Sequence, residues 1–164
     1  MSNTEQNLKD AFAGESQANR KYLAFAAAAD KEGFPQVARL FRAAAEAETV
    51  HAINHLRVLK GIKSTRENIQ EAINGETFEY TKMYPGMIKT AEAEDIPDAT
   101  RTFSFANSVE EIHAALYKKA LSTLDKKENY AYYVCPVCGN TFEKEAPDTC
   151  PICATKSKMF KKIE

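Results

Sequence analysis

The sequence predicts an all-α four-helix bundle followed by a small β domain that holds a metal ion. Three observations support this prediction: apolar residues recur at helical spacing over most of the chain, a pair of Glu-x-x-His motifs repeats within that part, and all four cysteines lie near the C-terminus. A length of 164 residues suits one ordinary domain with a small appendage. We therefore expect domains at residues 1–130 and 131–164.

The charge balance excludes several classes of protein. With 22 basic and 23 acidic residues, the net charge of -1 argues against binding to nucleic acid or to a membrane surface through bulk positive charge. No apolar run is long enough to span a bilayer. The first residues lack a basic segment followed by an apolar one, so we expect a cytoplasmic protein. The clustered cysteines favour a metal site over disulfides.

Helix-breaking and helix-capping residues mark the limits of the helices. Gly33 ends the first helix, and Pro35 suits the first turn of the second. Ser64 and Glu67 have the spacing of a capping box that opens the third helix, in which Pro85 should cause a kink. Beyond the fourth helix, proline, glycine and aromatic residues with paired cysteines are typical of a metal knuckle with short strands. The four helices are expected near residues 5–30, 35–60, 65–93 and 98–126.

The helical part repeats a pattern of acidic residues and histidine. Each half has a Gly-Glu pair, at Glu15 and Glu76, followed 33 or 34 residues later by Glu-x-x-His. These motifs comprise Glu48 with His51 and Glu110 with His113.

Residues three positions apart lie on one face of a helix, and in both motifs that face is also the apolar one. Carboxylates that point into a helix bundle are unfavourable unless a positive charge neutralises them. One Glu from each of two helices, with Glu-x-x-His from each of the other two, is the ligand pattern of ferritin-like dimetal carboxylate bundles. Oxygen and imidazole ligands suit iron or manganese. The sequence therefore predicts a dimetal site.

Four other side chains near the motifs are candidates for further roles at the site. Glu79 lies where the first repeat has Ala18, so it would be a seventh ligand that makes the two metals inequivalent. His55 is more readily a partner or surface residue than a ligand, because the second repeat has no counterpart. Tyr22 and Tyr84 are equally consistent with core packing and with hydrogen bonds to the carboxylates.

The C-terminal region contains two Cys-x-x-Cys pairs that are typical of a tetrahedral four-thiolate site. On spacing alone, a zinc ribbon is the commoner outcome. Attachment to a redox dimetal bundle favours iron instead, which would make the domain a one-electron carrier. The four predicted ligands are Cys135, Cys138, Cys150 and Cys153.

Several segments together resemble the rubrerythrin family over essentially the whole length. They read AFAGESQANRKY, ETVHAINH, GETFEYTKMYP, VEEIHAALY and YVCPVCGNTFEKEAPDTCPIC. The resemblance implies a ferritin-like di-iron domain joined to a rubredoxin-like Fe(Cys)4 domain. It also implies a non-haem peroxidase that reduces hydrogen peroxide to water in oxidative stress defence, with rubredoxin or an NAD(P)H-linked reductase as the electron donor.

The resemblance further implies a role for each site residue. Two glutamates would bridge the irons, three residues would be terminal ligands, His51 and Glu79 would exchange as ligands to the first iron, and two tyrosines would lie beside the site. The bridging residues are Glu48 and Glu110; the terminal ligands are Glu15 on the first iron, with Glu76 and His113 on the second; the tyrosines are Tyr22 and Tyr84. Ala154 stands where the family often has glycine, so we expect left-handed backbone there.

Two rival functions remain open at this point. The protein could handle iron as a ferroxidase, although the cysteine domain would then lack an obvious purpose. It could instead be a zinc-ribbon interaction module on a structural bundle.

The short connector after the second helix predicts a domain-swapped homodimer. In a ferritin-like bundle the second and third helices run parallel, so the chain would have to return along the bundle length between them. About five residues reach only about 17 Å, and roughly 30 Å is needed. We therefore expect each site to take Glu15, Glu48 and His51 from one protomer and the remaining ligands from its partner.

Overall fold

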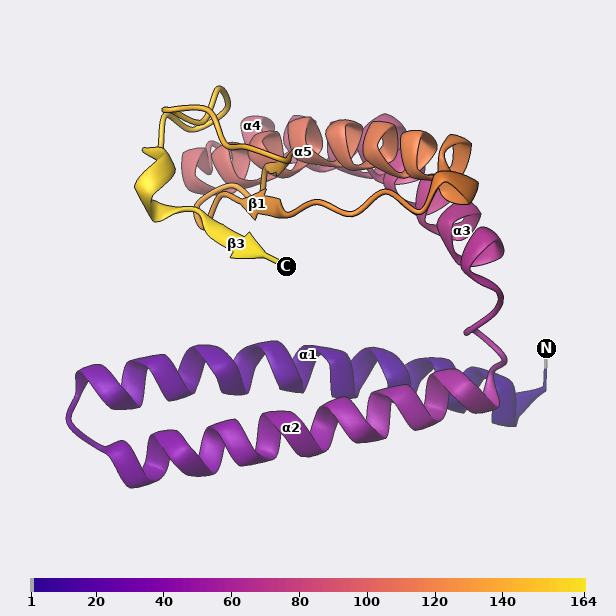
Figure 1. The fold of residues 1–164 in the computed structure, drawn as a ribbon. Helices are drawn as coiled ribbons and strands as arrows, with labels where there is room; N and C mark the ends of the chain where they lie inside the picture. Colours follow the sequence, from indigo (N-terminus) through magenta and orange to yellow (C-terminus); the bar gives the residue numbers. More distant parts are fainter. Residues whose placement is uncertain (1) are drawn as a thin grey trace. The chain divides into compact units, whose positions relative to one another are not determined.

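The structure is a computed structural model that describes residues 2–164 and contains two compact units, one ending at Lys63 and one spanning Ser64–Glu164 (Figure 1). The chain is mostly helical and ends in a small three-stranded sheet, which confirms the predicted fold class. No helix among the described residues combines the length and apolar character needed to cross a membrane. The predicted domain boundary near residue 130 stays a prediction.

The first unit is a hairpin of two long helices, α1 (Asn3–Lys31) and α2 (Pro35–Val58), which run side by side in Figure 1. The Ser2 side chain caps α1 by accepting a hydrogen bond from the backbone N–H of Glu5. Gly33 has a φ of 81° in the turn, a conformation that favours glycine. The buried positions of this hairpin are small, which allows the helices to approach closely: Ala26, Ala29, Ala38, Ala45 and Ala52.

The second unit begins with a helical hairpin of similar design. Its first arm comprises α3 (Thr65–Phe78), the π-helical turn η1 (Glu79–Met83) and α4 (Tyr84–Ala93), and its second arm is α5 (Pro97–Ser122). The predicted capping box at the start of α3 is confirmed, because Ser64 and Glu67 each accept a hydrogen bond from the other's backbone or side chain. Buried Ile73, Ala91 and Val109 lie at the centre of the hairpin.

The kink expected at Pro85 stays a prediction, and the structure has a π-helical turn just before this residue. The N–H of Tyr84 bonds to the carbonyl of Glu79, one residue further back than in an α-helix. Pro85 then lies in the first turn of α4, where its missing N–H has no consequence. The extra residue in this turn changes the face on which Glu79 and the following residues lie.

The C-terminal part is a three-stranded antiparallel sheet with two cysteine loops. The strands β1 (Tyr132–Val134), β2 (Thr141–Glu143) and β3 (Lys161–Ile163) pair in the order β2-β1-β3. Short 3-10 turns, η2 (Leu124–Lys126) and η3 (Ser157–Met159), lie before the sheet and before β3. The rings of Phe142 and Phe160 stack with their centres 5.4 Å apart and form part of the small core.

The two cysteine loops have the same backbone design. In the first, Gly139 has a φ of 83° and donates its N–H to the Cys135 carbonyl at 2.9 Å. In the second, Ala154 has a φ of 62° and donates to the Cys150 carbonyl at 2.9 Å. The left-handed backbone expected at Ala154 is therefore confirmed, and this residue carries a conformational strain that glycine avoids.

We predict that Ala154→Gly stabilises the protein by about 0.5–1 kcal/mol, because relief of the left-handed strain exceeds the added flexibility of the unfolded chain. Denaturant unfolding of the metal-loaded protein measures the change. Gly139→Ala is the matched control and should destabilise, although its added Cβ would meet only the Val109 side chain, at 3.9 Å. A shift of both variants in the same direction would contradict this explanation.

Candidate metal centres

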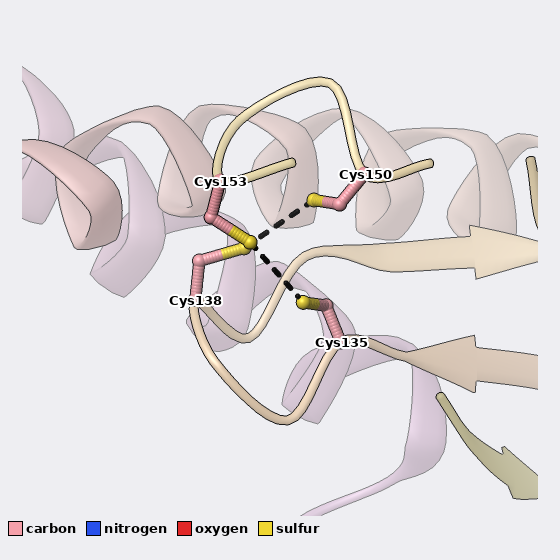
Figure 2. Close-up of side chains that lie close together, drawn as sticks. All are labelled: Cys135, Cys138, Cys150 and Cys153. Atoms are coloured by element: carbon pink, nitrogen blue, oxygen red, sulfur yellow. Dashed lines mark hydrogen bonds between the residues drawn. The ribbon is translucent and has the colours of Figure 1, made fainter. Parts of the chain in front are cut away.

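The four cysteines converge on one point from the two loops. Figure 2 shows the side chains of Cys135, Cys138, Cys150 and Cys153 pointing toward one another. The Sγ atoms of Cys135 and Cys153 are 3.5 Å apart, and those of Cys138 and Cys150 are 3.6 Å apart. A tetrahedral ion with bonds of about 2.3 Å separates its sulfur ligands by about 3.8 Å. The residues therefore fit a four-thiolate metal ion, as the sequence predicted.

Polar groups around the sulfur atoms favour the thiolate form that a metal requires. The Thr155 hydroxyl lies 3.1 Å from the Cys153 Sγ. Burial opposes ionisation of Cys153, but hydrogen bonds from the hydroxyl and N–H of Thr155 outweigh it and hold the pKa of the thiol below its usual value. Burial and contact with the other thiols raise the pKa of Cys138, so a positive ion is needed to complete the set.

The first carboxylate–histidine set comprises Glu15 of α1 with Glu48 and His51 of α2. Their ligand atoms all lie within 4.8 Å of one another. The Nδ1 atom of His51 is 2.9 Å from Oε2 of Glu48. This contact confirms that the two residues of the motif lie on one helix face. The grouping of the ligand atoms shows that this face meets Glu15 on the neighbouring helix.

The second carboxylate–histidine set has the same construction and comprises Glu76 of α3 with Glu110 and His113 of α5. Their ligand atoms also lie within 4.8 Å of one another. The Nδ1 atom of His113 is 2.8 Å from Oε2 of Glu110 and 3.9 Å from Oε1 of Glu76. The repeat seen in the sequence thus produces two similar sets of oxygen and nitrogen ligands, which suit iron.

The second set holds more negative charge than its environment stabilises. Burial, a hydrogen bond with Glu110 and the charges of Glu110 and Glu79 together raise the pKa of Glu76 to about 7. Burial and the charge of Glu110 likewise raise the pKa of Glu79. A bound cation would reverse these effects, so the electrostatics of the set fit a metal ion.

The remaining predicted site residues do not join the two sets. Glu79, on the π-helical turn, contributes no atom to either group of mutually close ligand atoms. Tyr84 lies close enough to the acids that burial and the charges of Glu110, Glu79 and Glu76 raise its pKa. Tyr22 packs against Phe25 and Phe41, with ring centres 6.3 and 6.1 Å apart.

One contact of the second set was not predicted from the sequence. The Nε2 atom of His113 lies 3.0 Å from the hydroxyl of Thr141, which is the first residue of β2. A hydroxyl 28 positions along the chain, beyond a change of domain, gives no signal in motif spacing. Only the packing of the C-terminal sheet against α5 reveals it.

Comparison with known proteins agrees with the two kinds of metal centre. The family model described as Rubrerythrin matches residues 6–121, and that described as Rubrerythrin, rubredoxin-like domain matches residues 133–161. Rubrerythrin-2 of Clostridium acetobutylicum is 36% identical over 96% of this chain and 95% of its own. Nigerythrin of Nitratidesulfovibrio vulgaris is 34% identical over 98% of this chain and 86% of its own.

Solved structures of nigerythrin are similar as well. The mixed-valence state has a TM-score of 0.60 and 34% identity, covering 99% of this chain and 88% of its own. The fully reduced, all-ferrous state has the same TM-score and coverage at 33% identity. With these matches over nearly its whole length, the chain belongs to the rubrerythrin family, iron-binding proteins of an oxidoreductase type, and carries their carboxylate–histidine di-iron ligands and rubredoxin-like four-cysteine site.

Proposed function

We propose that the protein is a peroxidase that reduces hydrogen peroxide to water in oxidative stress defence in the cytoplasm. The observation that carries this proposal is the pair of carboxylate–histidine sets, each with its ligand atoms within 4.8 Å, on a chain that also holds four convergent cysteines. Such a chain can bind two irons beside their own electron carrier. Ferroxidase activity alone would leave the carrier unused.

Bound iron supplies Lewis acidity and the electrons that cleave the O–O bond. The chain's own residues hold the irons and control their charge. In this proposal Glu48 and Glu110 would be ligands to both irons, Glu15 would be a terminal ligand to the first, and Glu76 and His113 would be terminal ligands to the second. His51 and Glu79 would be the alternative ligands to the first iron, one for each oxidation state.

The exposure of His51 and the π-helical position of Glu79 support this exchange. The side chain of His51 is 54% exposed, against 26% for His113. The π-helical turn at Glu79 interrupts regular packing at the point where a ligand would have to move.

Proton supply falls to the acidic residues in this proposal. Each peroxide takes up two electrons and two protons to form two waters. Tyr84, beside the same acids, is proposed as a second hydrogen-bonding group of the site. Tyr22 is proposed as its counterpart in the first repeat.

Electrons would reach the site one at a time through iron at the four cysteines. A rubredoxin or an NAD(P)H-linked reductase is the proposed external donor. The nigerythrin relatives support a redox role, since they have been solved in mixed-valence and all-ferrous states.

The connector between α2 and α3 supports a domain-swapped homodimer. The N–H groups of Leu59, Lys60 and Gly61 still bond back to α2, so only Ile62–Ser64 separate them from the start of α3. Four steps of chain reach about 14 Å. From His51 to Gly61 and from Thr65 to Glu76 the chain runs along about 30 Å of helix in total, so the connector is too short for a parallel return within one chain, which supports the swap.

Exposed apolar residues on the first hairpin also support this assembly. Leu40 is 67% exposed and Val50 is 53% exposed, on the helix that carries Glu48. Exposed apolar side chains that gather on one surface are typical of an interface. The proposed cover is the second hairpin of a partner chain, which would bring the two carboxylate–histidine sets together.

We predict that His51→Ala lowers peroxide turnover by about 100-fold or more, because loss of a metal ligand exceeds the 10–100-fold effect typical of outer-shell changes. Anaerobic assays with a reduced rubredoxin measure this. His55→Ala, one helical turn away on α2, is the matched control and should retain activity. Equal losses in both variants would mean that helix stability, not metal binding, explains the result.

The metal-free helical sets should make stability depend on pH. Because the pKa of Glu76 is raised from 4.5 to about 7 on folding, the folded protein holds a proton that the unfolded chain has lost. Stability should therefore fall as the pH rises from about 4.5 through 7 and level off above. Urea midpoints at pH 5 to 8, with zinc at the cysteines, measure this.

The variant Glu76→Gln is the matched control for the pH experiment, since its amide cannot titrate. Its urea midpoint should depend less on pH than that of the unmodified protein. Adding iron(II) should restore the stability of the unmodified protein at pH 8. Parallel pH curves for the two proteins would contradict the assignment.

Mixed dimers test the domain swap. We predict that Glu48→Ala and Glu110→Ala each abolish turnover, and that co-expressing the two chains restores it. In a swapped heterodimer one site receives both changes and the other receives neither, so about half of the activity per heterodimer returns. In an unswapped dimer every site keeps one defect. Differently tagged chains allow the heterodimer to be purified, and its inactivity would refute the swap.

A further inference from the structure

The two ring nitrogens of His113 face different parts of the chain. Its Nδ1 atom faces the carboxylates, 2.8 Å from Glu110 and 3.9 Å from Glu76. Its Nε2 atom lies 3.0 Å from the hydroxyl oxygen of Thr141. The helices thus supply the partners of one nitrogen, and the rubredoxin-like sheet supplies the partner of the other.

The cysteine loop determines where the Thr141 hydroxyl lies. Thr141 pairs with Val134 in the sheet, directly before Cys135. Its hydroxyl also lies 3.2 Å from the carbonyl of Gly139, to which it can donate a hydrogen bond. Gly139 in turn bonds to the Cys135 carbonyl. A loop closed around its metal therefore holds this hydroxyl in a defined position.

A second contact holds β2 against α5. Side chains two apart on a strand point to the same face, so Thr141 and Glu143 share one face of β2. Glu143 pairs with Lys119 of α5 and accepts a hydrogen bond from Tyr130 at 2.6 Å. Burial opposes its ionisation, but these two partners outweigh burial and lower the pKa of Glu143. With both residues engaged, β2 cannot slide along α5 without breaking a contact.

The chemistry of imidazole makes this arrangement directional. A neutral imidazole donates from one nitrogen and accepts, or binds a metal, at the other. The Thr141 hydroxyl oxygen can accept a hydrogen bond from Nε2–H of His113 while the hydroxyl donates its own hydrogen bond to the Gly139 carbonyl. This places the proton on Nε2 and leaves the lone pair of Nδ1 directed at the carboxylates, as a metal ligand requires.

We propose that Thr141 is a positioning residue that sets the tautomer and ring orientation of His113, so that the rubredoxin-like domain completes the outer shell of the second carboxylate–histidine set in the same chain. The inference rests on the proposed function, which assigns His113 as an iron ligand. It also joins the two metal centres by a hydrogen-bonded chain through His113, Thr141 and Gly139.

The first set offers an internal comparison. Among residues 2–164, the Nε2 atom of His51 has no hydrogen-bond partner, and this histidine is the more exposed of the two. Two otherwise similar sets therefore differ in one respect: both ring nitrogens of His113 have a partner, whereas only Nδ1 of His51 does.

Thr141→Val tests the proposal in the full-length protein, because valine keeps the shape of threonine but has no hydroxyl. With zinc at the cysteines, the helical sets are titrated with cobalt(II) against a competing chelator. We expect cobalt(II) binding at one of the two helical-set ions to weaken by about 10-fold in Thr141→Val. Thr141→Ser, which restores the hydroxyl, should bind within about 3-fold of the unmodified protein.

A second measurement reads the proton directly. In protein loaded with zinc at all sites, ¹⁵N NMR of the imidazoles should show a protonated Nε2 on His113 that exchanges slowly with solvent in the unmodified protein and in Thr141→Ser. In Thr141→Val that proton should exchange faster. Thr149→Val removes a hydroxyl elsewhere in the same domain, where it accepts from Lys156, and should change neither measurement.

The outcomes separate the two proposals. Normal cobalt(II) affinity and an unchanged His113 proton in Thr141→Val would overturn the role of Thr141 while leaving the proposed function intact. Failure of the unmodified protein to bind cobalt(II) at the helical sets would refute the proposed function, and the role of Thr141 with it. If Thr141→Val loses its cysteine-bound zinc, Thr141→Ala replaces it in the cobalt(II) titration and in the NMR measurement. The same results would then support or overturn the proposal.

Discussion

The mutual repulsion of acidic side chains is the constraint on which the rest of this structure depends. Glu76, Glu110 and Glu79 lie near one another on the second helical hairpin, and burial adds to their repulsion. Without a bound cation, protonation of Glu76 relieves the repulsion among these carboxylates, so the pKa of Glu76 rises to about 7. The same energetic demand that makes the metal-free state unfavourable makes the site selective for positively charged ligands.

Small residues between the helices allow the acidic side chains to come together around a shared cation. Alanines at the buried positions of α1 and α2 bring the two helices close, so that Glu15 on one lies against Glu48 and His51 on the other. The second hairpin reaches the same arrangement with α3 and α5. The repeated helical hairpin thus provides two comparable ligand sets. The two hairpins differ at Glu79, where the second one contains a π-helical turn.

The C-terminal sheet affects the helical part through a small number of polar contacts. Glu143 is tied to Lys119 and Tyr130, and Thr141 lies against His113. Because side chains two apart on β2 make these contacts, the strand acts as a rigid spacer between the cysteine loop and α5. In the proposal made above, the rubredoxin-like part also positions a ligand of the other centre through this contact.

Local spacing determined much of this protein from the sequence by itself. Glu-x-x-His places both residues on one helix face whatever the surroundings, and Cys-x-x-Cys closes a loop around one ion, so the sets around Glu48, Glu110 and Cys135 were predictable. Capping by Ser64 and the turn at Gly33 are local for the same reason. Only the tertiary structure decided the contact of His113 with Thr141, the π-helical turn and the place of Glu79 outside both sets. These depend on the packing of segments distant in sequence and on how a helix absorbs one extra residue, neither of which leaves a periodic signal.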